Sequence, residues 1–185
     1  MLKLLEKTRS FRRFCEEKRI SDSDMRDIVS AVRLAPSAAN LQRVRVAIVN
    51  DSLQNDRMFE TLSFAAYLKD WAGPAKGERP VAYAVIATER EPDVNLAMDI
   101  GLATEAMILV ARERGIGACL FRSFKPDAVS NVINKPGYIP VLVVAFGYPA
   151  EQVVIDPVRD GDVKYWRDEN GVHHVPKLSL DEIIL

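Results

Sequence analysis

The longest apolar stretch of the chain covers residues 93–114, and its hydrophobic positions do not keep to one helical stripe. It contains no proline, Asp93 can cap its first turn, and Gly115 follows as a stop signal. A helix of this length spans about 30 Å, and one that is apolar nearly all round must be covered nearly all round. We expect a core helix and not a membrane span, because Asp99 and Glu105 interrupt it.

The cover for this helix could come from its own chain or from a second subunit. A chain of 185 residues can hardly bury the whole surface of such a helix by itself. The small residues Gly101 and Ala103 would let another helix approach closely. We therefore favour a helix at the core of a homodimer over an ordinary buried helix of a monomer.

Shorter apolar patterns predict the remaining elements. Strands are expected at 44–50, 80–88, 118–121 and 138–148, and further helices at 21–34, 52–70 and 126–133. The Asn170-Gly171 pair predicts a hairpin within 164–175, and Ser179 precedes a last helical turn over 180–185. Helices interleaved with buried strands indicate an α+β layer fold. We expect one domain over 1–185, with a C-terminal extension or hairpin at about 160–185.

Composition and charge narrow the class of protein. The formal net charge is −1, so neither nucleic acid nor an anionic membrane is expected as a partner. The first twenty residues are nevertheless rich in lysine and arginine, which favours a bound anion. Cys15 and Cys119 lie far apart and outside any CxxC motif, which indicates free thiols in a reducing compartment. No apolar signal-peptide region is visible, so the expected location is the cytoplasm.

The usual catalytic constellations are not found in the sequence. The only histidines, His173 and His174, are adjacent, so in a strand they would point to opposite faces and not share a metal. The Gly115-Ile116-Gly117 stretch lacks the third glycine of a dinucleotide fingerprint and follows a helix instead of a strand. Cys119 stands in an apolar run and is interpreted as a core residue. An enzyme with so few reactive side chains would rely on a cofactor for the difficult step.

Three segments, taken together, resemble the nitroreductase family of FMN-dependent oxidoreductases. They are Arg9-Ser10-Phe11-Arg12-Arg13-Phe14, Ala35-Pro36-Ser37-Ala38-Ala39-Asn40-Leu41-Gln42, and Gly115-Ile116-Gly117 through Phe121-Arg122-Ser123. The strand that ends in Phe146-Gly147-Tyr148-Pro149 and the late basic residue Lys177 follow the order of the family. The resemblance covers nearly the whole chain, and the order and spacing of the motifs make it specific.

The resemblance implies a three-layer fold with a central, mostly antiparallel sheet, a long helix at the dimer interface, and FMN at that interface. It implies that NADH or NADPH passes hydride to flavin N5 and that a nitroaromatic, quinone or similar small acceptor then takes the electrons, in ping-pong fashion. The expected FMN-binding residues are Arg9, Ser10 and Arg12 near the phosphate and ribityl chain, Pro36, Ser37, Asn40 and Gln42 reaching the flavin of the other subunit, Phe121, Arg122 and Ser123 near the flavin N5 edge, and Lys177 near the phosphate. No protein side chain is expected to be catalytic.

The chain also departs from the family pattern. Thr8 and Arg9 stand where two basic residues are common, and Arg43-Val44 replaces the family's Pro-Trp after the loop glutamine. Without the resemblance, the basic N-terminus could be a solvated surface and the loop at 35–42 a plain connection. Other flavin chemistries of the same superfamily, namely reductive dehalogenation, dehydrogenation and flavin breakdown, remain open, as does a non-catalytic flavin-binding dimer.

Overall fold

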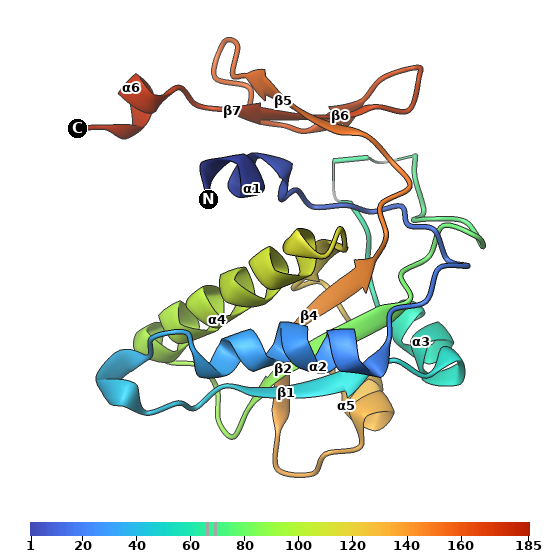
Figure 1. Ribbon diagram of the computed structural model, residues 1–185, viewed down its shortest axis with the longest axis vertical. Helices are drawn as coiled ribbons and strands as arrows, with labels where there is room; N and C mark the ends of the chain where they lie inside the picture. Colours follow the sequence, from blue (N-terminus) through green and yellow to red (C-terminus); the bar gives the residue numbers. More distant parts are fainter. Residues whose placement is uncertain (66, 69) are drawn as a thin grey trace.

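A four-stranded antiparallel sheet lies at the centre of the computed structural model, which describes residues 1–65, 67–68 and 70–185 (Figure 1). Across the sheet the strands are β1 (Arg45–Val49), β2 (Ala82–Thr88), β4 (Ile139–Gly147) and β3 (Gly117–Phe121). All four strands were expected from the sequence, with ends that differ by at most two residues. Every side chain of β2 is buried, as a strand covered on both faces requires.

Helices cover both faces of this sheet and so form three layers. On one face, α2 (Asp22–Ser30) and α4 (Val94–Glu113) pack against Ala84 and Ile86 of β2. On the other face, α3 (Ser52–Phe59) and α5 (Pro126–Ile133) pack against Tyr83 and Val85 of the same strand. The alternation along β2 therefore sends successive side chains into two separate cores. The predicted α+β three-layer architecture is confirmed.

The long apolar helix α4 begins and ends within one residue of its expected bounds. Asp93 caps it by accepting a hydrogen bond from the backbone N–H of Leu96 at 2.8 Å. By length and composition alone α4 would pass for a membrane span, although Asp99 and Glu105 were expected to disqualify it. Its packing argues for a core helix, because it contacts α1 (Leu2–Lys7), α2, β3 and the 3-10 turn Ala31–Arg33.

The helix expected over 52–70 is shorter than predicted, because α3 ends at Phe59. The Thr61 hydroxyl donates to the carbonyl of Met58 at 2.7 Å, and the chain then runs beside residues 123–125. There the N–H of Ser63 donates to the carbonyl of Ser123 at 2.9 Å. This pairing with a distant segment competes with further helical turns. Two positions of the predicted helix, 66 and 69, lie outside the described residues.

The C-terminal part of the chain forms a second, smaller sheet. Its strands, in spatial order, are β5 (Val153–Pro157), β7 (His173–Lys177) and β6 (Trp166–Arg167), followed by α6 (Leu180–Ile183). Strands β6 and β7 form the predicted hairpin, and Ser179 caps α6 as expected. The sequence did not reveal β5, which pairs in parallel with β7. Figure 1 shows this sheet on the far side of α1 from the central sheet.

Candidate functional site

The N-terminal motif lies across the ends of β3 and β4. The N–H of Phe11 donates to the carbonyl of Ala118 at 3.0 Å, and the rings of Phe11 and Phe14 are buried. Gly117 and Gly147 are directly paired between the two strands. A Cβ on Gly117 would come within 2.7 Å of the Phe11 ring, and one on Gly147 within 2.7 Å of the Phe14 ring. The two glycines therefore make room for the phenylalanines that anchor the arginine motif.

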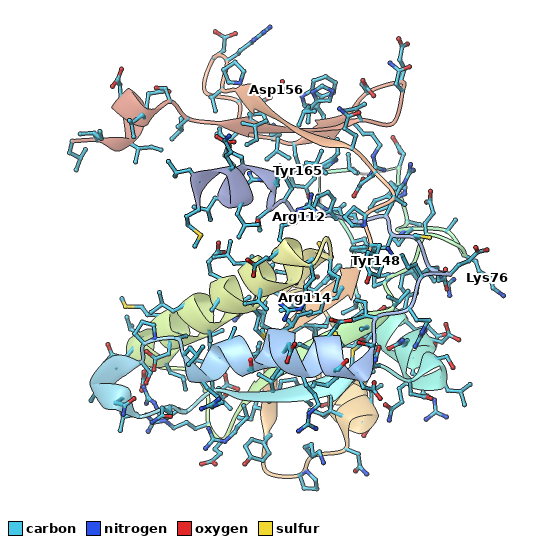
Figure 2. The ribbon with its side chains drawn as sticks, in the orientation of Figure 1. Lys76, Arg112, Arg114, Tyr148, Asp156 and Tyr165 are labelled. Atoms are coloured by element: carbon cyan, nitrogen blue, oxygen red, sulfur yellow. The ribbon has the colours of Figure 1, made fainter. Side chains whose placement is uncertain are left out.

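Arg9 and Ser10 line a cavity of about 130 Å³ between α1, α4 and the start of β3. Arg9 donates from Nη2 to the carbonyl of Leu5 at 2.8 Å, and its Nε is buried without a hydrogen-bond partner in the described part of the chain. From the last turn of α4, Arg112 lines the same cavity, and its guanidinium lies 5.2 Å from the centre of the Phe11 ring. Figure 2 shows Arg112 between α4 and α1. Partial burial lowers the pKa of Arg112.

Arg12 points away from this cavity and toward the C-terminal sheet. Its Nη1 donates to Nε2 of His173 at 2.9 Å and to the carbonyl of Ser10 at 3.2 Å. The guanidinium also lies 4.4 Å from the centre of the Tyr165 ring, a cation–π distance. Burial, followed by the neighbouring charges of Arg12 and Arg167, lowers the pKa of His173 to about 4. His173 is therefore neutral and serves as a hydrogen-bond acceptor for Arg12.

Glu151 reinforces this contact from the segment between the two sheets. Its carboxylate accepts hydrogen bonds from the backbone N–H groups of Arg12 and Arg13, and it forms an ion pair with Nη2 of Arg167 at 2.8 Å. The Glu151 side chain is only 2% exposed, so the pair is well shielded from water. The adjacent His174 faces elsewhere, since its Nδ1 lies 2.6 Å from Asp156. The two histidines thus contact different partners, as expected for adjacent residues of a strand.

The small-residue loop at 36–42 lines a second cavity, of about 160 Å³, with Pro36, Ser37, Gln42 and Asp99 among its lining residues. Ala39, Asn40 and Gln42 have positive φ angles of 49°, 53° and 49°, which are uncommon for residues other than glycine. Asp99 of α4 holds the loop by accepting the N–H of Ala38 at 2.9 Å. Its second oxygen, Oδ2, is buried without a hydrogen-bond partner among the described residues. Asn40 is exposed beside the cavity.

The remaining predicted site residues lie at two other places. The Phe121 side chain belongs to the core, where its ring lies 4.8 Å from that of Phe64, so only its backbone could face a ligand. Arg122 and Ser123 are exposed where β3 ends, and the Ser123 carbonyl accepts a hydrogen bond from Ser63. Lys177 is exposed at the end of β7.

Within this one chain the predicted residues do not converge on a single pocket. Arg9 and Ser10 share a cavity with Glu105, Ile108 and Arg112 of α4, whereas Pro36, Ser37 and Gln42 share one with Asp99 and Ala103, nearer the start of the same helix. Sequence reasoning missed Arg112, Asp99 and His173 as members of these sites. A basic residue in the last turn before Gly115 and a carboxylate within an apolar helix were the available signals for the first two.

Fold and site together define a three-layer α+β protein with an arginine-lined cavity at the end of a long apolar helix. The sequence model of the Nitroreductase family matches residues 5–148. A curated protein of Archaeoglobus fulgidus, provisionally described as an NADH dehydrogenase/NAD(P)H nitroreductase, is 30% identical over an alignment of 162 residues that covers 82% of this chain and 86% of that protein. The chain therefore belongs to the nitroreductase family.

Solved structures show the same fold at low sequence identity. The nitroreductase family protein of Streptococcus pneumoniae TIGR4 has a TM-score of 0.70 at 17% identity, over 100% of this chain and 98% of that one. The FMN-dependent nitroreductase of Mycobacterium smegmatis, in complex with NADPH, has a TM-score of 0.64 at 16% identity, over 80% of this chain and 87% of that one.

Proposed function

We propose that this protein is an FMN-dependent oxidoreductase that takes electrons from NADH or NADPH and delivers them to a nitroaromatic, a quinone or a similar small acceptor. Membership of the nitroreductase family supports the class of reaction. The names of relatives, which include an FMN-dependent nitroreductase bound to NADPH, support the cofactors. The observation that carries the proposal is that Arg9 and Ser10, the motif residues expected at the phosphate, line one cavity.

The donors on this chain fit FMN in kind. A phosphate dianion requires charge-assisted donors, which the guanidinium of Arg9 and the hydroxyl of Ser10 provide. The buried Nε of Arg9 has no hydrogen-bond acceptor among the described residues, so this donor lacks the partner that a buried polar group requires. The polar loop that includes Ser37, Asn40 and Gln42 offers neutral donors and acceptors beside the small residues Ala38 and Ala39, which allow a flat ring to approach.

When bound, FMN would supply the hydride and electron transfer that the side chains of this protein cannot perform. The chain would bind and orient it: Arg9 and Ser10 at the phosphate, Arg12 and Lys177 as further cations, and the backbone at 121–123 beside the ring. A backbone N–H at that strand end would stabilise negative charge on the ring. Both histidines are held in other contacts, and burial raises the pKa of Cys119 to about 11, so we propose that water supplies protons.

The proposal includes a homodimer with its FMN sites at the subunit interface. Val94, Met98 and Leu102 of α4 recur at four-residue spacing and are 71%, 62% and 49% exposed, which leaves an apolar stripe on a core helix. The loop cavity and the arginine cavity use different stretches of α4 within one chain. A second copy packed along this stripe would allow the loop of one subunit to approach the arginine cavity of the other.

The proposal also includes one domain over 1–185, with the C-terminal sheet as an extension of the family core, acting in the cytoplasm. The family match ends at residue 148, just before β5, which is consistent with an added segment. Cys15 and Cys119 are free thiols, as a reducing compartment requires.

Steady-state kinetics test the proposed reaction. Two substrates that use one pocket in turn give ping-pong behaviour, so initial rates measured against NADH or NADPH at several fixed acceptor concentrations should give parallel double-reciprocal lines. A panel of nitroaromatics and quinones would identify the acceptor class. Intersecting lines would contradict the single shared pocket, and no acceptor-dependent oxidation of either nicotinamide would contradict the reaction itself.

A further inference from the structure

Two arginines from distant parts of the sequence line the cavity between α1, α4 and β3. Arg9 reaches it from the N-terminal motif and Arg112 from the last turn of α4. Neither forms an ion pair with a carboxylate in the part of the chain that the structure describes. Glu105 also lines the cavity, but its side chain is exposed.

The position of Arg112 contrasts with that of Arg114, two residues further along. Arg114 pairs with Asp24 at 3.6 Å and with Asp27 at 3.0 Å, both on α2, and so has an ordinary structural role. Arg112 instead lies over the Phe11 ring, partly buried, at the edge of the cavity. A partly buried cation is costly to keep unless an anion compensates it, and a phosphate would do so.

The other cations expected at the phosphate are placed differently. Arg12 donates to His173 and lies over Tyr165, and neither of these residues lines the cavity. Lys177 is exposed on β7 and does not line the cavity either. Of the arginines in the N-terminal motif, only Arg9 reaches the cavity, so the second cation there comes from α4.

We propose that Arg112 is a phosphate-binding residue, which grips the terminal phosphate of FMN together with Arg9 and Ser10. This inference rests on the proposed FMN-dependent function and extends it by naming a phosphate-binding residue that lies outside the three motif segments. Arg112 would bind the phosphate and not the ring system, so it should distinguish FMN from riboflavin, which has the same ring and ribityl chain without the phosphate.

The test is a fluorescence titration of the flavin-stripped full-length protein with FMN and, separately, with riboflavin. Arg112→Gln should weaken FMN binding by about ten- to one-hundred-fold, the usual effect of losing charge-assisted hydrogen bonds, and leave riboflavin binding unchanged. Arg112→Lys keeps the positive charge but loses the planar guanidinium with its paired N–H donors. Its affinity for FMN should therefore fall between those of Arg112→Gln and the wild type. Arg114→Gln, the same charge change at the same helix end, should leave the ratio of FMN to riboflavin affinity unchanged.

Inorganic phosphate provides a second measurement that needs no variant. It should compete with FMN in the wild type but not with riboflavin, and Arg112→Gln should reduce that competition. Unchanged FMN affinity in Arg112→Gln, or an equal loss for FMN and riboflavin, would overturn the assignment of Arg112 while leaving the proposed function intact. A wild-type protein that binds neither flavin would overturn both.

Discussion

The guanidinium of Arg12 donates to Nε2 of the buried His173 at 2.9 Å, across 161 positions of sequence. This contact joins the N-terminal motif to the C-terminal sheet. Because Nε2 accepts, the proton of the neutral ring is on Nδ1. The orientation of Arg12 therefore depends on a histidine that stays uncharged, and the C-terminal sheet acts as a support for the proposed flavin site.

Replacing His173 with glutamine should reduce the acid sensitivity of the fold. The pKa of His173 is lowered to about 4 in the folded state from an ordinary value of 6.5, so between these two values the unfolded chain binds a proton that the folded chain does not. Stability contributed by the neutral ring is present above pH 6.5 and is lost as the pH falls toward 4. His173→Gln keeps an acceptor without this titration, so its free energy of unfolding should fall less between pH 7 and pH 4.5.

Denaturant unfolding at several pH values measures this difference. His173→Leu is the matched control, because it removes both the titration and the acceptor and should be less stable than His173→Gln at every pH. Wild type and His173→Gln curves that run parallel across the range would contradict the neutral, buried state of His173.

Replacing Gly147 with alanine should destabilise the protein. The new Cβ would lie 2.7 Å from Cδ1 and 2.8 Å from Cβ of Phe14, whose side chain is fully buried. Such overpacking typically costs about 1–3 kcal/mol. Denaturant unfolding measures the loss, and the double variant with Phe14→Leu should recover part of it, since the smaller side chain relieves the overlap. If the two substitutions lower the free energy of unfolding additively, the Phe14 ring is not what the new Cβ at position 147 overlaps.

A lysine at Met98 should separate the proposed dimer. Met98 lies in the centre of the exposed stripe on α4, and a buried, unpaired charge at a subunit interface is strongly unfavourable. Light scattering should therefore give twice the 20.7 kDa chain mass for the wild type and the single chain mass for Met98→Lys. Leu53→Lys is the control: it replaces an apolar residue on α3, in the opposite layer, that is at least as exposed as Met98, and this variant should remain dimeric. A monomeric wild type would contradict the interface.

The elements set by strong local patterns could be predicted from the sequence. The helix α4 has an Asp93 cap and a glycine after its end, and the strands β2 and β4 are continuous apolar runs, so their bounds were expected within two residues. The helix predicted over 52–70 was too long, because the observed helix ends where Leu62 and Ser63 pair with residues 123–125, a contact between distant segments. Strand β5 was missed because it is short, half-exposed and paired in parallel with a strand from a later segment.

The site was predictable in its motifs but not in its contacts. The N-terminal motif indicated Arg9, Ser10 and Arg12 together as residues near the phosphate and the ribityl chain. In the structure Arg9 lines the cavity beside α4, whereas Arg12 donates a hydrogen bond to His173. That division depends on the placement of the C-terminal sheet, which no local pattern encodes. Arg112 was passed over for the same reason, since a basic residue in the last turn of a helix is common and its relation to Arg9 arises only in the folded chain.

The proposed FMN-dependent function is tested most directly by the visible absorption spectrum of the purified protein, recorded without oxygen before and after addition of NADH or NADPH. We expect a yellow protein with the absorption of oxidised flavin, which is bleached by at least one of the two nicotinamides and restored by a quinone or nitroaromatic acceptor. A protein that stays colourless after incubation with FMN, or a yellow one that neither nicotinamide bleaches, would contradict it.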